Sequence, residues 1–249
     1  MRIRFWTLAL AGAITCALPV IAAAQPHVGV IMWRHDTEMK VNAATDWDGS
    51  NDTADQRGKD WDLKSSGIGV RAGYMFPKIV TVHGDIGVAQ ATARSLDVSD
   101  VDLDMTSRGL DEGLSLSVGI DASDRFPGAE HLFWGASLSA RKFSSELDED
   151  ITTKWEFDET TLSFGGRIGY AVKDIGVYGG LRFVSDDIDL QATDVSRAPG
   201  EQVRHIDLER DGGTDLIVGA EFRGMPVTGF VEFGFIGSFG ATTGMAMHF

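Results

Sequence analysis

Apolar and polar residues alternate along most of the chain, in short segments that come in pairs. In the clearest segment, residues 68–76, apolar side chains such as Ile68 and Val70 alternate with small or charged ones such as Arg71. Strict alternation predicts a β-strand whose two faces meet different surroundings. Pro77-Lys78 then predicts a tight turn before the next alternating segment.

The same pattern recurs often enough to predict ten strands, and the connections between them alternate in length. The links near Pro77, Pro127, Asp174 and Gly224 are short, whereas those at 41–62, 94–112, 144–157 and 191–212 are long and polar. The predicted strands are 28–40, 68–76, 80–88, 114–120, 134–140, 162–172, 177–183, 216–222, 227–235 and 239–249. An even number of strands puts both ends of the chain on one side of the sheet.

Alternating short turns and long loops favour a closed antiparallel transmembrane β-barrel, an all-β fold, of about ten strands, with eight or twelve also compatible. The strands of a soluble β-sandwich would also alternate apolar and polar residues, but that fold does not explain why short and long connections alternate along the chain. Aromatic residues also gather near the predicted short turns: Tyr74, Phe76, Trp134, Tyr170, Phe222 and Phe249. Because an unpaired backbone group in lipid costs several kcal/mol, we expect the first and last strands to be neighbours.

The N-terminal segment predicts export. Arg2 and Arg4 precede an apolar stretch that Pro19 ends, and Ala22-Ala23-Ala24 offers a cleavage site, so residues 1–24 are predicted as a signal peptide and 25–249 as one barrel domain. Cleavage would remove Cys16, which is the only cysteine, and would change the formal charge from −15 to −17 because two arginines are lost. Such acidity argues against nucleic acid as a partner.

The polar face of the predicted strands carries many glycines and serines together with charged residues of both signs. A lumen of this kind has two interpretations. Guanidinium–carboxylate pairs could fill it, which we favour for about ten strands, or a narrow polar pore could remain. The charged residues predicted to form this lumen network are Arg71, His83, Asp85, Asp121, Arg141, Arg167, Arg182, Glu221, Arg223 and Glu232, with His248 on the same face.

The long loops are strongly acidic. Carboxylate oxygens suit Ca²⁺ or Mg²⁺, but none of the four loops has the spacing of an EF-hand. A solvated, repulsive rim is therefore the favoured interpretation, without a specific metal site or cofactor. Divalent ions could still bridge these loops to the phosphates of lipopolysaccharide.

The end of the chain, Met245-Ala246-Met247-His248-Phe249, together with the hairpin pattern and the predicted signal peptide, resembles outer-membrane β-barrel proteins. Small OmpA-like, opacity-type and porin-family barrels look most similar. The resemblance implies a Gram-negative outer membrane. It also implies that Phe249 is the signal read by the barrel-assembly machinery, and that periplasmic chaperones escort the chain.

Three functions are compatible with such a barrel. We favour a structural or surface-interaction role in contact with outer-membrane lipids and lipopolysaccharide, without enzyme activity, over a narrow porin-like channel. The third is a hydrolase at the external rim, because His205 and Asp207 would share one face and could act with Asp97 or Asp104. This resembles the omptin proteases, but the order of His205 and Asp207 is the reverse of the omptin Asp-x-His.

Overall fold

The computed structural model describes residues 24–45, 60–76, 80–95, 112–148, 152–198, 202–210 and 213–249. Within these ranges no helix is long and apolar enough to cross a membrane. Nearly all of the predicted signal peptide, the predicted turn at Pro77-Lys78 and much of the predicted loops lie outside them. The strands are β1 (Gln25–Thr45), β2 (Asp60–Met75), β3 (Val80–Ser95), β4 (Gly113–Phe126), β5 (Ala129–Asp148), β6 (Thr153–Val172), β7 (Ile175–Asp194), β8 (Val203–Arg210), β9 (Thr214–Phe222), β10 (Val227–Ile236) and β11 (Ser238–His248).

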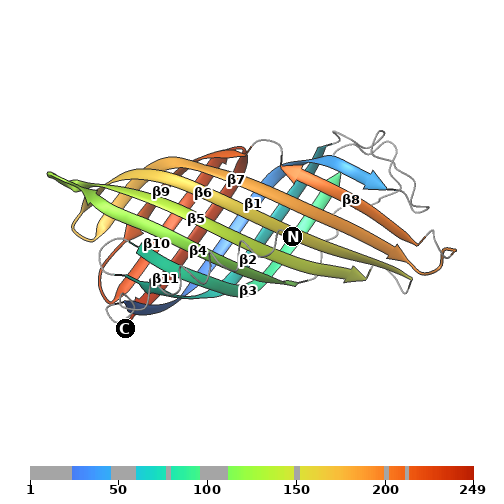
Figure 1. Cartoon of the computed structure of the whole chain (residues 1–249), viewed down its shortest axis with the longest axis horizontal. Helices are drawn as coiled ribbons and strands as arrows, with labels where there is room; N and C mark the ends of the chain where they lie inside the picture. The colour runs from blue at the N-terminus through green and yellow to red at the C-terminus, as the bar shows by residue number, and fades with distance from the viewer. Residues whose placement is uncertain are drawn as a thin grey trace, which may run out of the picture.

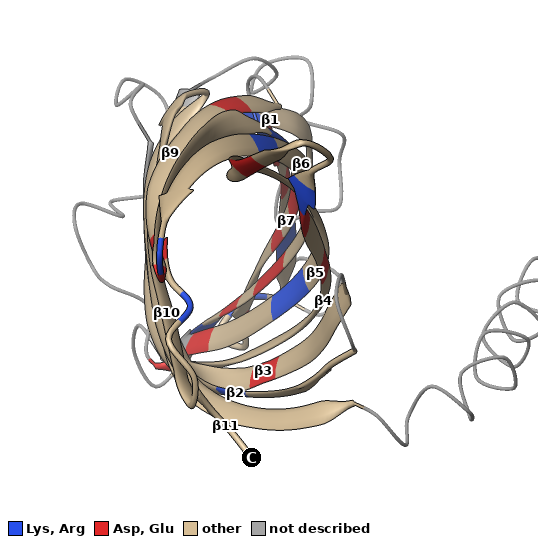
Figure 2. Cartoon of the chain, turned by 90° about the vertical axis from the view of Figure 1, so that its left-hand side faces the viewer, with Lys and Arg blue, Asp and Glu red and all other residues tan. Residues whose placement is uncertain are grey.

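Ten of these strands close into a ring, which Figure 2 shows from the end that holds the C-terminus. The order is β1 to β7 followed by β9, β10 and β11, and every pair is antiparallel. β11 pairs with β1 from His27↔His248 to Thr37↔Ser238, and the Phe249 amide donates to the Pro26 carbonyl at 3.1 Å. The predicted closed barrel and its neighbouring first and last strands are therefore confirmed.

The outer wall of this ring is apolar. On β6, for example, every second side chain from Leu162 to Val172 points outward, and Ile168 is 61% exposed. That stretch matches the roughly 9–11 residues with which a tilted strand crosses a bilayer. Equivalent rows on the other strands make a continuous exposed apolar surface, which a water-soluble protein does not present.

Above this band the two faces of the long strands, β1, β2, β3, β5, β6 and β7, exchange their character. The outward side chains of β7 are apolar through Phe183 and then become Ser185, Asp187 and Asp189, while the inward ones change from Arg182 to the fully buried Ile188. The period of two continues without interruption through the exchange. Hence the strands leave the lipid and continue as a sheet that is polar outside and apolar inside. In Figure 1 this projecting part lies at the right, where β8 is labelled.

β8 narrows the wall in this projecting part. β7 pairs with β9 up to Phe183 and with β8 from Asp187, and β1 pairs with β11 up to Thr37 and with β8 from Met39. In this part β8 alone thus occupies the place that β9, β10 and β11 occupy in the membrane-spanning ring. Because barrel diameter grows with strand number, and about eight strands leave a space that side chains can fill, the narrowed part can be packed solid.

Two of the predicted loops are largely wrong as loops. Within 144–157, β5 continues to Asp148 and β6 begins at Thr153, and within 191–212, β7 continues to Asp194 and β8 occupies Val203–Arg210. The acidic residues at outward strand positions there include Glu146, Glu156, Asp207 and Glu209, and the apolar residues between them point inward. In the 41–62 link, β1 also continues to Thr45 and β2 begins at Asp60.

Candidate functional site

The lumen carries charged layers at successive heights, and the lowest lies near the short turns. The carboxylate oxygens of Glu221 lie 2.6 Å from a guanidinium nitrogen of Arg223 and 3.5 Å from one of Arg167. Nearby, His83 Nδ1 lies 3.3 Å from an Asp121 oxygen. Arg223 extends over the ring of Phe133, with its guanidinium carbon 5.2 Å from the ring centroid. Glu221 is therefore paired with two arginines, and Asp121 with a histidine on the neighbouring strand.

The next layer pairs residues on strands that are adjacent in the wall or separated by one strand. Arg71 donates two hydrogen bonds to Asp85, at 2.7 and 2.9 Å, and Ser117 donates a third at 2.6 Å. Arg182 and the hydroxyl of Tyr178 both donate to Glu232, at 3.0 and 3.1 Å. Bidentate and charge-assisted bonds of this kind hold long side chains in one geometry.

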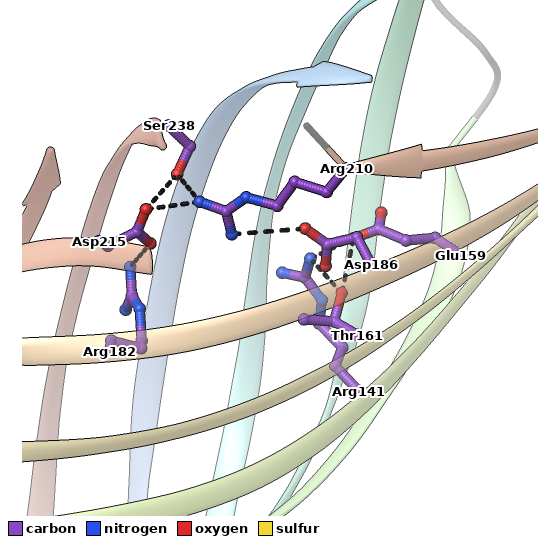
Figure 3. Close-up of polar contacts among 8 residues, drawn as sticks. All are labelled: Arg141, Glu159, Thr161, Arg182, Asp186, Arg210, Asp215 and Ser238. Atoms are coloured by element: carbon purple, nitrogen blue, oxygen red, sulfur yellow. Dashed lines mark hydrogen bonds and ion pairs between the residues drawn. The ribbon is translucent and has the colours of Figure 1, made fainter. Parts of the chain in front are cut away.

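Asp215 is the centre of the third layer (Figure 3). Its side chain is completely buried and accepts hydrogen bonds from Arg182 at 3.1 Å, from Ser238 at 3.2 Å and from Arg210. Arg210 ends β8, Asp215 lies on β9 and Ser238 opens β11. The carboxylate therefore joins β8 to the strands that it replaces in the wall.

Arg141 on β5 extends the third layer along the wall, past β7 and β6. It donates to Glu159, which is 2% exposed and also accepts from Thr161 at 3.0 Å, and Asp186 lies 3.6 Å from Arg210. Glu159 and Asp186 fall inside or beside the stretches predicted as loops, so the sequence analysis missed them. Counting in twos from Arg167 to Glu159, or from Arg182 to Asp186, would have placed both on the inward face.

An apolar cluster, here called the apolar cap, lies directly above the third layer. Its members are nearly inaccessible, with Ile188, Leu190 and Leu208 at 0% exposure, and Phe143 meets Phe157 with ring centroids 5.5 Å apart. Since the members come from strands on opposite sides of the barrel, they fill the interior. They are Met39, Val41, Ala44, Trp61, Leu63, Ala89, Ala91, Phe143, Trp155, Phe157, Ile188, Leu190, Ala192, Ile206 and Leu208.

Trp33 lies between the apolar cap and the charged layer. It packs against the cap, and the guanidinium carbon of Arg141 lies 5.8 Å from its ring centroid. A Cβ atom on Gly67, which pairs with Trp33 on β2, would lie 2.3 Å from the indole. Glycine is therefore needed at position 67 for the ring to lie flat on the wall.

The predicted lumen residues all lie on the inner side of the barrel or at its mouth. Arg223 is at the mouth, with 43% of its side chain exposed. Sequence reasoning missed Tyr178, Arg210 and Asp215 as members of the network.

The rim residues His205 and Asp207 share one face of β8, as expected, but it is the outer face. His205 Nδ1 lies 3.8 Å from Asp189 on β7, and both side chains are about half exposed. Their proposed partners Asp97 and Asp104 lie outside the described residues. Among the residues that the structure describes, no three His, Cys, Asp or Glu side chains are arranged to hold a metal ion.

Asp207 is opposite Asp189 in the β7–β8 ladder, so two carboxylates face each other. Partial burial, and next the nearby Asp189 and Asp187, raise the pKa of Asp207. A raised carboxyl pKa means that stability is present at low pH and is lost as the pH rises above the ordinary value near 3.8. We therefore expect Asp207→Asn to strengthen this ladder at pH 7, on the order of 0.3 kcal/mol given solvent screening.

Hydrogen exchange at the β7–β8 amides at pH 7 measures this effect, which should appear as slower exchange in the variant. Asp194→Asn is the control of opposite sign, because hydrogen bonds from Ser196 lower the pKa of Asp194. Faster exchange in Asp207→Asn than in the wild type would contradict the expectation.

No protein-family model and no curated protein matches the sequence. Solved structures do match. OprG of Pseudomonas aeruginosa is 14% identical over 91% of this chain and 96% of its own, with a TM-score of 0.47. The transport unit of the autotransporter AIDA-I of Escherichia coli is 10% identical over 90% of both chains, with a TM-score of 0.45. The outer-membrane protease OmpT of Escherichia coli is 10% identical over 90% of this chain and 97% of its own, with a TM-score of 0.43.

The assignment of this chain rests on its own geometry. A closed ring satisfies the backbone groups of every strand that meets lipid. The ring carries a continuous apolar surface outside and charged layers inside. With these features the chain is a closed transmembrane β-barrel whose ring has ten strands.

Proposed function

We propose that the chain is a sealed outer-membrane barrel with a structural or surface-interaction role, and that it does not conduct solutes. The observation that carries this proposal is the apolar cap, whose side chains from opposite walls meet above the membrane. A hydrated solute would have to part these contacts and lose its own hydration to pass. The third charged layer just below adds buried ion pairs across the same space.

A narrow porin-like channel is the second candidate. The polar lower lumen favours it, because charged and small side chains there could border a water-filled path. Such a path would need the apolar cap to move aside. The two candidates therefore differ in whether the cap is a permanent seal.

Planar-bilayer conductance of the refolded full chain tests the seal. We expect no stable unitary current steps from the wild type, and steps from a variant that combines Phe143→Ala with Phe157→Ala, because removing both rings empties part of the cap. A matched variant, Phe164→Ala, changes a lipid-facing ring on the same strand as Phe157 and should stay silent. Regular steps from the wild type would reject the seal in favour of the channel.

We infer that the projecting sheet is the part that meets partners outside the cell, with lipopolysaccharide at the rim. Arg34, Lys64 and Lys142 occupy outward positions just above the apolar band, each beside a carboxylate. Phosphate groups of the lipid could exchange with those carboxylates. During biogenesis the chain would meet periplasmic chaperones and the barrel-assembly machinery.

We also propose that the chain has no enzyme activity. If the hydrolase alternative held, replacing His205 and Asp207 with alanine would abolish cleavage of surface substrates by cells that display the protein. Absence of cleavage by cells that display the wild type, compared with cells that lack the protein, would agree with the proposal. Cleavage that depends on the wild-type protein would reject it, and its loss in the variant would assign the activity to His205 and Asp207.

A further inference from the structure

Two histidines face each other where the barrel closes. His27 on β1 and His248 on β11 are direct partners in the antiparallel ladder, and their rings lie 5.3 Å apart between centroids with planes inclined at 37°. Both side chains are on the lumen side, and His27 is only 4% exposed. The pair therefore spans the junction between the first and last strands of the ring.

Each of these rings has a nitrogen without a hydrogen-bond partner. His248 Nε2 lies 2.9 Å from the hydroxyl oxygen of Thr228, which leaves its Nδ1 unpaired, and His27 Nδ1 is also buried and unpaired. A buried polar atom without a partner costs free energy, so it calls for an explanation such as a water or an ion. Two such atoms on directly opposed residues point to one shared species between them.

We propose that His27 and His248 bind one divalent transition-metal ion of the Zn²⁺, Ni²⁺ or Cu²⁺ type. Neutral imidazole is the commonest protein ligand for these ions. With a metal–nitrogen distance of about 2.1 Å, each ring centroid would lie about 3.2 Å from the ion. Centroids 5.3 Å apart then correspond to an angle of about 110° at the metal, close to a tetrahedral arrangement.

The surroundings fit a site with two protein ligands completed by water. The bond to Thr228 orients the His248 ring through its other nitrogen, as residues behind metal-bound histidines do. His27 lies over Gly73 of β2, where a Cβ atom would come within 2.7 Å of the ring. Arg71 and His83 also lie near His27, and they pair with Asp85 and Asp121. The positive charge of Arg71 sets a limit on the affinity of the site for a cation.

Calorimetric titration of the full chain without an affinity tag, refolded in detergent at pH 7.5, tests the site with Zn²⁺ alone. We expect one ion per chain, binding at least tenfold weaker in His27→Gln and in His248→Gln, and binding lost at pH 5 because protonated imidazoles cannot coordinate. His131→Gln is the matched control, because that histidine is exposed near the same end of the barrel and should not contribute. Equal affinity in the wild type and both glutamine variants would overturn the proposal.

A second measurement avoids the variants altogether, in case they assemble poorly. Electron paramagnetic resonance of the wild type with one equivalent of Cu²⁺ should show coupling to two equivalent imidazole nitrogens. Zn²⁺ should also raise the temperature at which the folded barrel converts to the unfolded form on gels, because an ion on both strands stabilises their junction. A spectrum with no nitrogen coupling would mean that a water, and not a metal, occupies the space between the two rings.

Discussion

Asp215→Ala is expected to destabilise the barrel by about 3–5 kcal/mol, the usual cost of removing one partner from a buried ion pair. The carboxylate is 0% exposed and accepts from Arg182, Arg210 and Ser238. Its loss would take one of two carboxylate partners from each of two buried guanidinium groups, leaving Arg182 with Glu232 and Arg210 with Asp186. The effect should be largest at the junction of β8 with the ring, because Arg210 loses its main contact there.

Urea titration of the refolded protein in lipid vesicles, followed by tryptophan fluorescence, measures this loss. Asp215→Asn keeps an acceptor and the shape of the side chain, so it separates the missing charge from the missing volume. Asp194→Ala serves as the control at the surface, because Asp194 pairs with Arg197 there and solvent-exposed pairs contribute little to stability. If Asp215→Ala changed stability no more than Asp194→Ala, the account of the third layer would be wrong.

Phe157→Ala is the second change with a large expected effect, again about 3–5 kcal/mol, because it leaves a cavity in a packed interior. Phe157 is 1% exposed and packs against Phe143 in the apolar cap. Protease added outside the vesicles should also cut β7 or β8 faster, since the two strands pack on this ring. The same urea titration gives the magnitude.

Phe164 provides a control on the same strand with the same side chain. It is 56% exposed, faces lipid and stacks on Phe183 at 4.8 Å. Phe164→Ala should therefore cost clearly less, because lipid chains can occupy the space that the ring leaves. Equal costs for Phe157→Ala and Phe164→Ala would indicate that the cap is not a packed core.

The lipid-facing part of the fold was predictable because one simple rule governs it. Ile68 to Phe76 alternates strictly, and an apolar residue outside means a polar one inside, so Arg71 and Asp85 could be placed on the inner face from the sequence alone. Closure followed from the energetic cost of open edges in lipid. The partners of each charge depended on the register between strands, which alternation by itself does not give.

The projecting part was missed because the same rule reverses there. Ile206 and Leu208 alternate with Asp207 and Glu209 as regularly as any membrane strand, but so many carboxylates in a short stretch resemble a solvated loop. Glu159 could be assigned to the inward face only by continuing the two-residue alternation of β6 beyond the end of the apolar band. Composition pointed to loops where periodicity pointed to strands, and periodicity was the better guide.

The position of β8 in the chain has a consequence for the order of folding. β8 precedes β9 to β11 in sequence, yet it already pairs with both β7 and β1. Once those two pairings exist, β8 holds β7 and β1 together, and β9, β10 and β11 have only to insert between them. The loop that closes at that stage runs from β8 to β11 and not from one end of the protein to the other. A shorter loop lowers the entropic cost of the final step. Nucleation outside the bilayer, followed by completion of the wall within it, is the pathway that this connectivity favours.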